Sequence, residues 1–447
     1  MSVLCEFLET IRKPAHLLVA ISGGSDSTGL LIGLHACLSS FPDIRLSAVT
    51  IDHALRHEAA EEAQTVARLC AGLGIFHVTR RWEGEKPVTG LAAAAREARY
   101  TLLSAIADEI GATAIVTGHT ADDQIETAVM RRERRSGLAS PSAQRPANAA
   151  AHPSPSAVEN EPLDFPSHGL AGMARATLLD GRHWILRPLL ATGRADIRAF
   201  LTANGRGWID DPSNLDRRSE RVRIRQTLAD GNARLDAETI ATAGRMRADL
   251  AQRAADWLAA HAAVERAIVC RIDPAGLAAD PATVRHALSV LAAVLGGRAH
   301  LLSRDHADGL MNFMKGGAPG RMTAGRVVFD RRRDGLFLLR ENRNLPHLLV
   351  EPGQTATWDN RFRIENRMAR PVDIRGGGED AVFRFAPDGI ANLAKRVTPH
   401  VAEGDRDGVI VTPHLALFDR FLPVFDLPLA SATAVLMGRP PYLLPPV

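Results

Sequence analysis

Long apolar runs are missing from this 447-residue chain, because none reaches the roughly 18 residues that a membrane-spanning helix needs. The first residues also lack the basic-then-apolar pattern of a secretory signal peptide. Both absences predict a cytoplasmic protein that has no membrane partner.

Cysteine is scarce, and its positions, Cys5, Cys37, Cys70 and Cys270, include no Cys-x-x-Cys pair. This scatter argues against a zinc or iron–sulfur site and is typical of a reducing compartment. Lysine is rare as well, so nearly all of the positive charge is arginine, and the formal net charge is only +3. A charge this small does not by itself indicate a nucleic-acid partner, so local clusters of arginine matter more.

The bulk composition is that of a globular protein, with 46% hydrophobic and 23% charged residues. At this length we expect two or three domains. The first, residues 1–225, alternates apolar strand patterns with helix patterns, which predicts an α/β domain whose Rossmann-like parallel sheet has helices on both faces. Strands are expected at residues 16–21, 45–52, 75–80, 113–117 and 185–190, and helices at 28–39, 57–74, 91–110 and 195–204.

A glycine-rich stretch, residues 21–27 (Ile-Ser-Gly-Gly-Ser-Asp-Ser), joins the first expected strand to the first expected helix. Such glycines let the backbone approach a phosphate, and the helix N-terminus attracts an anion. There is no Gly-Lys-Ser/Thr ending, so this is not a Walker A loop. Asp26 would repel a phosphate unless a divalent cation lay between them, so the stretch predicts phosphate together with Mg²⁺. The alternative is that Ser25 and Asp26 only cap the helix.

A second polar stretch, residues 118–127, follows the fourth expected strand and contains a capping-box-like start from Thr120 to Asp123. On the helix that follows, Asp122, Asp123 and Glu126 are three or four residues apart, so their carboxylates can share one face. Beside a phosphate site, they and His119 suit metal binding and phosphate contact. The alternative is that these acidic residues only interact favourably with the helix dipole.

The carboxyl ends of parallel strands form the ligand-binding edge of such a sheet. Ser22, Asp52 and Gly118 each follow or end an expected strand. The sequence therefore predicts that the two polar stretches and Asp52 meet in one crevice.

The glycine-rich stretch resembles the pyrophosphate-binding loop of the ATP pyrophosphatase (PP-loop) superfamily, whose members cleave ATP between the α- and β-phosphates and adenylate a substrate. Residues 22–27, 51–56, 95–100 and 118–127 are similar, in the same order, to one tRNA-modifying family of that superfamily, and residues 185–190 and 208–214 extend the likeness. Members of that family join free L-lysine to C2 of the wobble cytidine of isoleucine tRNA with a CAU anticodon. The resemblance implies a carbon–nitrogen ligase that uses ATP and Mg²⁺.

The same resemblance implies roles for individual residues. ATP would bind against Ser22, Gly23, Gly24, Ser25, Asp26, Ser27, Asp52 and Gly118. Mg²⁺ would be held by Asp26 and Asp123. The catalytic residues would be Asp26, His119, Asp122, Glu126 and Arg221, and an acidic residue would orient the lysine or complete the metal site.

The rest of the chain is less informative. Residues 217–225 carry five arginines, which suit RNA phosphates or a polyanionic leaving group, although a solvated helix face is the alternative. Residues 139–168, rich in proline, serine and alanine, predict a disordered insertion. We expect a helical linker and tRNA-recognition domain over residues 226–345, with a hairpin turn at 330–335, and a small β-rich domain over 346–447. The oligomeric state stays open, with a homodimer as one option.

Two other readings of the sequence remain. A tRNA thiolase or an amidotransferase-type synthetase belongs to the same superfamily, but the first needs paired cysteines and the second a glutaminase or a partner subunit. A non-catalytic nucleotide- or RNA-binding relative is the other, and the retained Asp26, Asp122, Asp123 and Glu126 argue against it.

Overall fold

The structure is a computed structural model that describes residues 2–56, 58–136, 170–210, 223–225, 236–378, 380–401 and 408–447. Its contacts divide the chain into two compact units, Met1–Arg247 with Leu444–Val447, and Ala248–Leu443. The expected insertion at residues 139–168 and most of the arginine-rich segment 217–225 lie outside the described residues. The three-domain division of the sequence stays a prediction.

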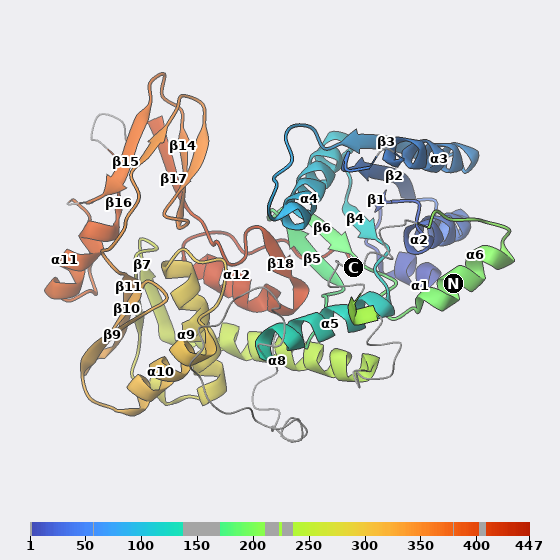
Figure 1. The fold of residues 1–447 in the computed structure, drawn as a ribbon. Helices are drawn as coiled ribbons and strands as arrows, with labels where there is room; N and C mark the ends of the chain where they lie inside the picture. Colours follow the sequence, from blue (N-terminus) through green and yellow to red (C-terminus); the bar gives the residue numbers. More distant parts are fainter. Residues whose placement is uncertain are drawn as a thin grey trace, which may run out of the picture. The chain divides into compact units, whose positions relative to one another are not determined.

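The first unit is built on a mostly parallel sheet with the strand order β5-β6-β4-β1-β2-β3 (Figure 1). All neighbours are parallel except β5 and β6, which form an antiparallel pair. β1 and β4 are buried along their whole length, which suits their largely apolar sequences, and the buried His16 of β1 hydrogen-bonds to Ser47 at 2.8 Å. The strands are β1 (Ala15–Ala20), β2 (Ile44–Asp52), β3 (Phe76–Arg81), β4 (Ala114–Thr117), β5 (Ala176–Leu179) and β6 (His183–Leu186).

Helices flank this sheet on both sides, with α1, α2 and α6 together on one side and α4 on the other (Figure 1). α2 is buried on nearly all sides, and Gly29 allows α6 to approach it, because a Cβ there would lie 2.4 Å from Ile197 Cγ2. The α/β architecture expected from the sequence is confirmed. The helices are α1 (Ser2–Thr10), α2 (Ser25–Cys37), α3 (Ala59–Gly72), α4 (Leu91–Ile110), α5 (Ala121–Ser136), α6 (Arg194–Ala203) and α8 (Ala237–His261).

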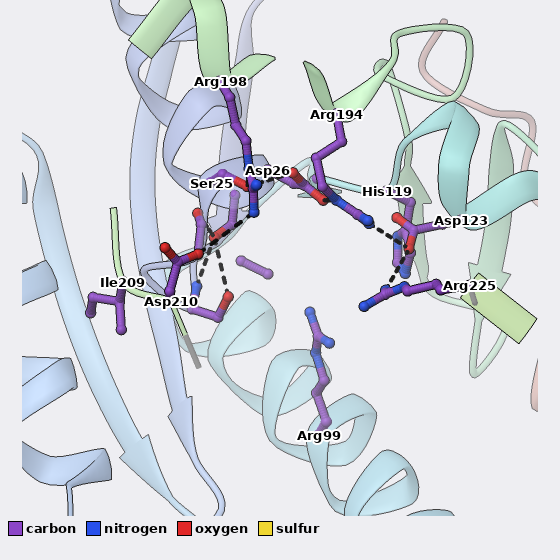
Figure 2. A pocket seen from close by; sticks show the side chains of 15 residues that line it. Ser25, Asp26, Arg99, His119, Asp123, Arg194, Arg198, Ile209, Asp210 and Arg225 are labelled. Carbon is purple, nitrogen blue, oxygen red and sulfur yellow. Dashed lines mark hydrogen bonds and ion pairs between the residues drawn. The ribbon is translucent and has the colours of Figure 1, made fainter. Parts of the chain in front are cut away.

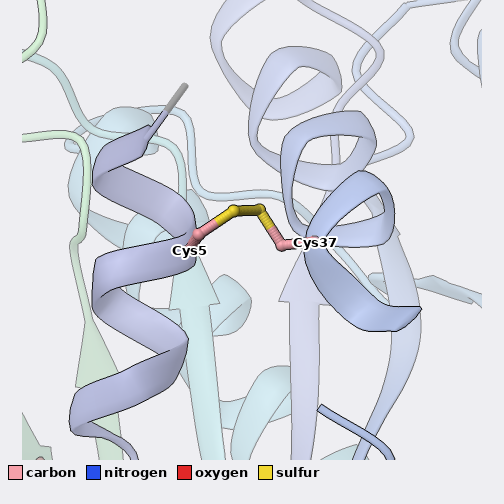
Figure 3. The surroundings of a disulfide bond; sticks show 2 residues. All are labelled: Cys5 and Cys37. Carbon is pink, nitrogen blue, oxygen red and sulfur yellow. A yellow bond between two sulfur atoms is a disulfide. The ribbon is translucent and has the colours of Figure 1, made fainter. Parts of the chain in front are cut away.

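A disulfide bond joins Cys5 of α1 to Cys37, the last residue of α2 (Figure 3). The spacing of these two cysteines gave no sign of the pairing, which arises because α1 packs along α2. Cys70 and Cys270 are free and buried, and burial raises the pKa of the Cys70 thiol to about 11. The sequence analysis therefore missed the Cys5–Cys37 disulfide.

The second unit contains an antiparallel sheet with the order β7-β8-β11-β10-β9. The expected hairpin is present, since Arg332 pairs with Gly335 across a two-residue turn. This sheet comprises β7 (Ala262–Glu265), β8 (Val269–Ile272), β9 (Gly320–Ala324), β10 (Val327–Arg332) and β11 (Gly335–Arg340), and the helices α9 (Pro281–Leu295) and α10 (Arg304–Lys315) pack on it.

The rest of the second unit is β-rich, as expected from its glycine- and proline-punctuated sequence. Two small antiparallel sheets, β12-β15-β16 and β13-β14-β17, share an apolar core with α11 and β11. The strands are β12 (Leu348–Val350), β13 (Thr355–Trp358), β14 (Phe362–Asn366), β15 (Val372–Gly376), β16 (Pro399–Val401), β17 (Val409–Pro413) and β18 (Phe421–Pro423), and the helices are α11 (Asp388–Val397) and α12 (Leu427–Leu436). Within the described ranges, none of the helices is both long and apolar enough to cross a membrane.

Candidate active site

A cavity of about 700 Å³ opens at the carboxyl ends of β1 and β4 in the first unit (Figure 2). Its walls carry four arginines and three aspartates, so the net charge of the lining is positive although part of it is acidic. The polar and charged residues that line it are Ser22, Ser25, Asp26, Ser27, Arg99, His119, Asp123, Arg194, Arg198, Asp210 and Arg225.

The glycine-rich stretch forms the floor of the cavity. Gly23 has φ +85°, a left-handed conformation that favours glycine, and a Cβ there would lie 2.6 Å from Ile209 Cδ1. The turn is closed by Ile209, whose amide donates to the Gly23 carbonyl at 2.9 Å. Gly24 is the N-cap of α2 and has no side-chain cap. The alternative in which Ser25 and Asp26 only cap the helix is therefore not what the structure shows.

Hydroxyl groups hold this turn in shape. Ser27 Oγ accepts from the Ser22 amide at 3.1 Å and donates to the Gly24 carbonyl at 3.2 Å, while Thr28 Oγ1 donates to the Gly23 carbonyl at 3.1 Å. At the neighbouring strand end, a Cβ on Gly118 would lie 2.8 Å from the Asp26 carbonyl oxygen. The two polar stretches of the sequence are thus in direct contact, and glycine is required where they meet.

Asp26 points from the start of α2 toward α6, where Arg194 Nε donates to Asp26 Oδ2 at 2.9 Å (Figure 2). Its other oxygen, Oδ1, accepts from Ser25 Oγ at 2.9 Å. Burial lowers the pKa of Arg194, but the hydrogen bond and the charge of Asp26 outweigh burial and raise that pKa above its usual value. One turn later on α6, Arg198 Nε donates to Ser25 Oγ at 3.4 Å.

The start of α5 is the acidic side of the cavity. The expected capping box is confirmed, because Asp123 Oδ2 accepts from the Thr120 amide at 3.0 Å and Thr120 Oγ1 accepts from the Asp123 amide at 3.4 Å. This leaves Asp123 Oδ1 for cations, and Arg194 Nη2 lies 3.3 Å from it. Asp122 does not line the cavity; its Oδ2 accepts from the Arg194 amide at 2.8 Å and fixes the start of α6.

Glu126 is nearly inaccessible to solvent, at 2% exposure. Its Oε1 accepts from Arg225 Nε, whereas its Oε2 is buried and has no hydrogen-bond partner among the described residues. Burial raises the pKa of Glu126, although the hydrogen bond from Arg225 acts in the opposite direction. A buried carboxylate oxygen without a partner is costly, which suits a position that receives a donor from a ligand.

His119 and Asp52 occupy different places. His119 lines the cavity, and its Nδ1 lies 2.9 Å from Thr117 Oγ1, which fixes the ring at the end of β4. Asp52 ends β2 with its Oδ1 accepting from the Ala54 amide at 2.7 Å, and it is not among the residues that line the cavity. Arg221 lies outside the described residues, but Arg225 of the same segment reaches the cavity.

Asp26 and Asp123 each present a carboxylate oxygen to a cation, because Arg194 contacts Asp26 through Nε and Asp123 through Nη2. Mg²⁺ is usually bound in proteins by one or two carboxylates, with phosphate oxygens and water completing its shell. Across the described ranges there is no group of three or more His, Cys, Asp or Glu that would hold a metal without such help. The donor set therefore fits Mg²⁺ that arrives with a nucleotide.

Comparison with known proteins gives the same picture from independent data. A family model described as the PP-loop domain matches residues 2–155 and 162–231. The tRNA(Ile)-lysidine synthase of Rhizobium meliloti (strain 1021) is 42% identical over 457 residues, which cover 99% of this chain and 96% of that protein. The chain belongs to the tRNA(Ile)-lysidine synthase family.

Two further members of the tRNA(Ile)-lysidine synthase family agree over nearly the whole chain. The protein of Mesorhizobium japonicum is 39% identical and covers 96% of this chain, and that of Brucella ovis is 36% identical and covers 95%. Alignment at this length extends the resemblance seen in the sequence motifs, which covered the first unit only, to the second unit as well.

Within this tRNA(Ile)-lysidine synthase fold, the sequence analysis missed three arginines of the cavity: Arg99 of α4, and Arg194 and Arg198 of α6. Arg99 lies in a motif that was recognised without a role, Arg198 lies in a segment predicted only as a helix (195–204), and Arg194 directly precedes that segment. Their spacing of four residues on α6 puts both on one helical face, which was the available signal. Nothing in the sequence told which way that face would point.

Proposed function

We propose that this chain ligates free L-lysine to C2 of the wobble cytidine of isoleucine tRNA with a CAU anticodon, at the expense of ATP. The observation that carries the proposal is the cavity itself, in which a glycine turn at a helix N-terminus, four arginines and the Asp123 carboxylate of α5 face one space. The triphosphate would lie against the turn formed by Ser22, Gly24 and Ser27, close to the N-terminus of α2.

The reaction has two steps. The cytidine C2 oxygen attacks the α-phosphorus of ATP, a P–O bond forms, and pyrophosphate leaves. The ε-amine of lysine then attacks C2, a C–N bond forms, and the C2–O bond breaks to release AMP. Arg99, Arg194 and Arg198 would stabilise the negative charge on the phosphates. Mg²⁺, when bound through Asp26, would screen the phosphate charge from that carboxylate.

The lysine ε-ammonium has a reference pKa of about 10.4, so its proton must be removed before it attacks. Glu126 is suited to accept it, because burial raises the pKa of its carboxyl and one carboxylate oxygen has no partner in the described part of the chain. Asp123, three residues earlier on α5, gives a second acceptor for the ammonium. His119 is fixed at the cavity wall, where it would contact the α-phosphate.

A thiolase mechanism does not suit this site. The bonded pair Cys5–Cys37 stands at the far end of α2 from the glycine turn, and 12 helical steps at 1.5 Å place Cys37 roughly 18 Å from Ser25. The free thiols of Cys70 and Cys270 are buried. Action in the cytoplasm and a homodimeric assembly stay predictions.

The test is to incubate the protein with ATP, isotope-labelled lysine and transcribed tRNA, and then to analyse the anticodon nucleosides by mass spectrometry. We expect the wobble cytidine to be replaced by a labelled nucleoside heavier by one lysine residue. Asp26→Asn should abolish this product, whereas Asp43→Asn, an exposed change just before β2 at the opposite end of the sheet, should not. Nucleotide binding without any modified nucleoside would favour the non-catalytic alternative.

A further inference from the structure

Arg194 contacts the four acidic residues that the sequence analysis gave a catalytic or metal-binding role. Its backbone amide donates to Asp122 Oδ2 at 2.8 Å, and its Nε donates to Asp26 Oδ2 at 2.9 Å. Its Nη2 lies 3.3 Å from Asp123 Oδ1, and its Nη1 lies 3.9 Å from Glu126 Oε1. One guanidinium therefore spans the gap between the start of α2 and the start of α5 (Figure 2).

Two other arginines of the cavity, Arg198 and Arg225, each contact residues on one side of this gap. Arg198 contacts Ser25 and Asp210, on the side of the glycine turn. Arg225 contacts Asp123 and Glu126, on the side of α5. The Arg194 guanidinium, in contrast, contacts a carboxylate on both sides.

We propose that Arg194 couples the two substrate sites, holding the α5 carboxylates closed to lysine until a nucleotide draws its guanidinium toward the phosphates. This inference rests on the proposed function, because it takes Asp123 and Glu126 as the acceptors of the lysine ammonium. Without nucleotide, the guanidinium and an incoming ammonium compete for the same carboxylate oxygens. With nucleotide, phosphate oxygens offer the guanidinium stronger, bidentate partners.

The geometry favours movement of the side chain rather than of the helix. The Arg194 backbone is anchored by Asp122 and by the packing of α6 on α2, whereas the guanidinium is only partly buried, at 21% side-chain exposure. When the Arg194 guanidinium moves away, Glu126 still accepts a hydrogen bond from Arg225, so its negative charge keeps a positively charged partner. Asp123 Oδ1 then loses its contact with Arg194 at 3.3 Å and keeps only the more distant Arg225 Nη2 at 4.0 Å, so it can accept the lysine ammonium.

The experiment measures lysine binding to the full-length protein by equilibrium dialysis, with and without saturating α,β-methylene-ATP and Mg²⁺. In the unaltered protein we expect the analogue to tighten lysine binding by about 5- to 150-fold, the usual range for coupled sites. In Arg194→Met, lysine should bind without the analogue, and the ratio of the two dissociation constants should fall to about one. Arg206→Met, which removes an exposed arginine just beyond the end of α6 and outside the cavity lining, should keep the ratio of the unaltered protein.

Each outcome has a distinct meaning. A ratio of one in the unaltered protein, or an unchanged ratio in Arg194→Met, overturns the coupling and leaves the proposed function in place. Lysine binding in no condition, by any of the three proteins, overturns the proposed function. Circular dichroism spectra of both variants establish that α6 is retained, and Arg194→Lys, which keeps a charge but cannot bridge two carboxylates, should also lose most of the coupling.

Discussion

Gly23→Ala should damage the glycine turn mainly through its contact with Ile209, because the next nearest side chain, Val66, lies 3.2 Å from the added Cβ. Two costs apply: the left-handed φ of +85°, worth about 1–2 kcal/mol for a residue with a Cβ, and a Cβ placed 2.6 Å from Ile209 Cδ1. Crowding of this kind typically costs about 1–3 kcal/mol. We therefore expect the free energy of unfolding of the first unit to fall by about 2–5 kcal/mol.

Gly84 supplies a matched control, because its φ is +84° but a Cβ there would meet nothing within 4 Å. Gly84→Ala should therefore show the backbone cost alone, about 1–2 kcal/mol. The contact partner in Gly23→Ala is the far end of the isoleucine side chain, so relief comes by displacing Ile209, which also lines the cavity. We accordingly expect the KM for ATP to rise about tenfold or more in Gly23→Ala, equivalent to about 1.4 kcal/mol of binding, and to stay unchanged in Gly84→Ala.

Both effects are measured by urea unfolding followed by tryptophan fluorescence and by pyrophosphate release at varied ATP. Adding Ile209→Ala to Gly23→Ala removes the crowded methyl and should restore the steric part of the stability loss, leaving the backbone part. The reasoning is refuted if Gly23→Ala and Gly84→Ala lose equal stability and share the ATP KM of the unaltered protein.

Three further predictions concern stability. Asp359→Asn should lower the free energy of unfolding, measured with urea, by about 3–5 kcal/mol, because it removes the carboxylate that pairs with two buried arginines, Arg340 and Arg361. Asp373→Asn, at an exposed ion pair, should lower it by about 1 kcal/mol or less. Cys5→Ala should lower the free energy of unfolding by roughly 3–4 kcal/mol, because it removes the disulfide that links residues 32 positions apart. Adding a reductant should then have no further effect on the stability of this variant. Burial lowers the pKa of three histidines in the first unit, His16, His53 and His77, so their protonation favours the unfolded chain. The free energy of unfolding should therefore fall as the pH drops below about 6.5, and a variant with glutamine at all three positions should lose this dependence.

The fold of the first unit could be predicted because its signals are local. Apolar runs such as β4 (Ala114–Thr117) and the long α4 (Leu91–Ile110) are set by composition and periodicity over a few residues, and α4 has the expected bounds. β5 (Ala176–Leu179) was missed because it directly precedes β6 in an antiparallel pair, and a four-residue strand carries too little pattern of its own.

The site could be predicted only as far as its motifs reach. Gly23, Asp26 and Glu126 were found because they lie in short stretches with recognisable chemistry, and the structure brings their stretches together. Arg194 and Arg198 could not be found in this way, because their position follows from how α6 packs on α2. These helices are more than 150 residues apart in the sequence; the hydrogen bond from Arg194 to Asp26, for example, joins residues 168 positions apart. The Cys5–Cys37 bond escaped for the same reason.

The fate of one oxygen atom tests the central chemistry most directly. A tRNA carrying ¹⁸O at C2 of the wobble cytidine is incubated with the protein, ATP, Mg²⁺ and lysine, and the released AMP is analysed by mass spectrometry. Adenylation of that oxygen in the cavity above the glycine turn predicts one ¹⁸O atom in each AMP molecule. AMP without the label, or labelled oxygen retained in the modified tRNA, would contradict the account.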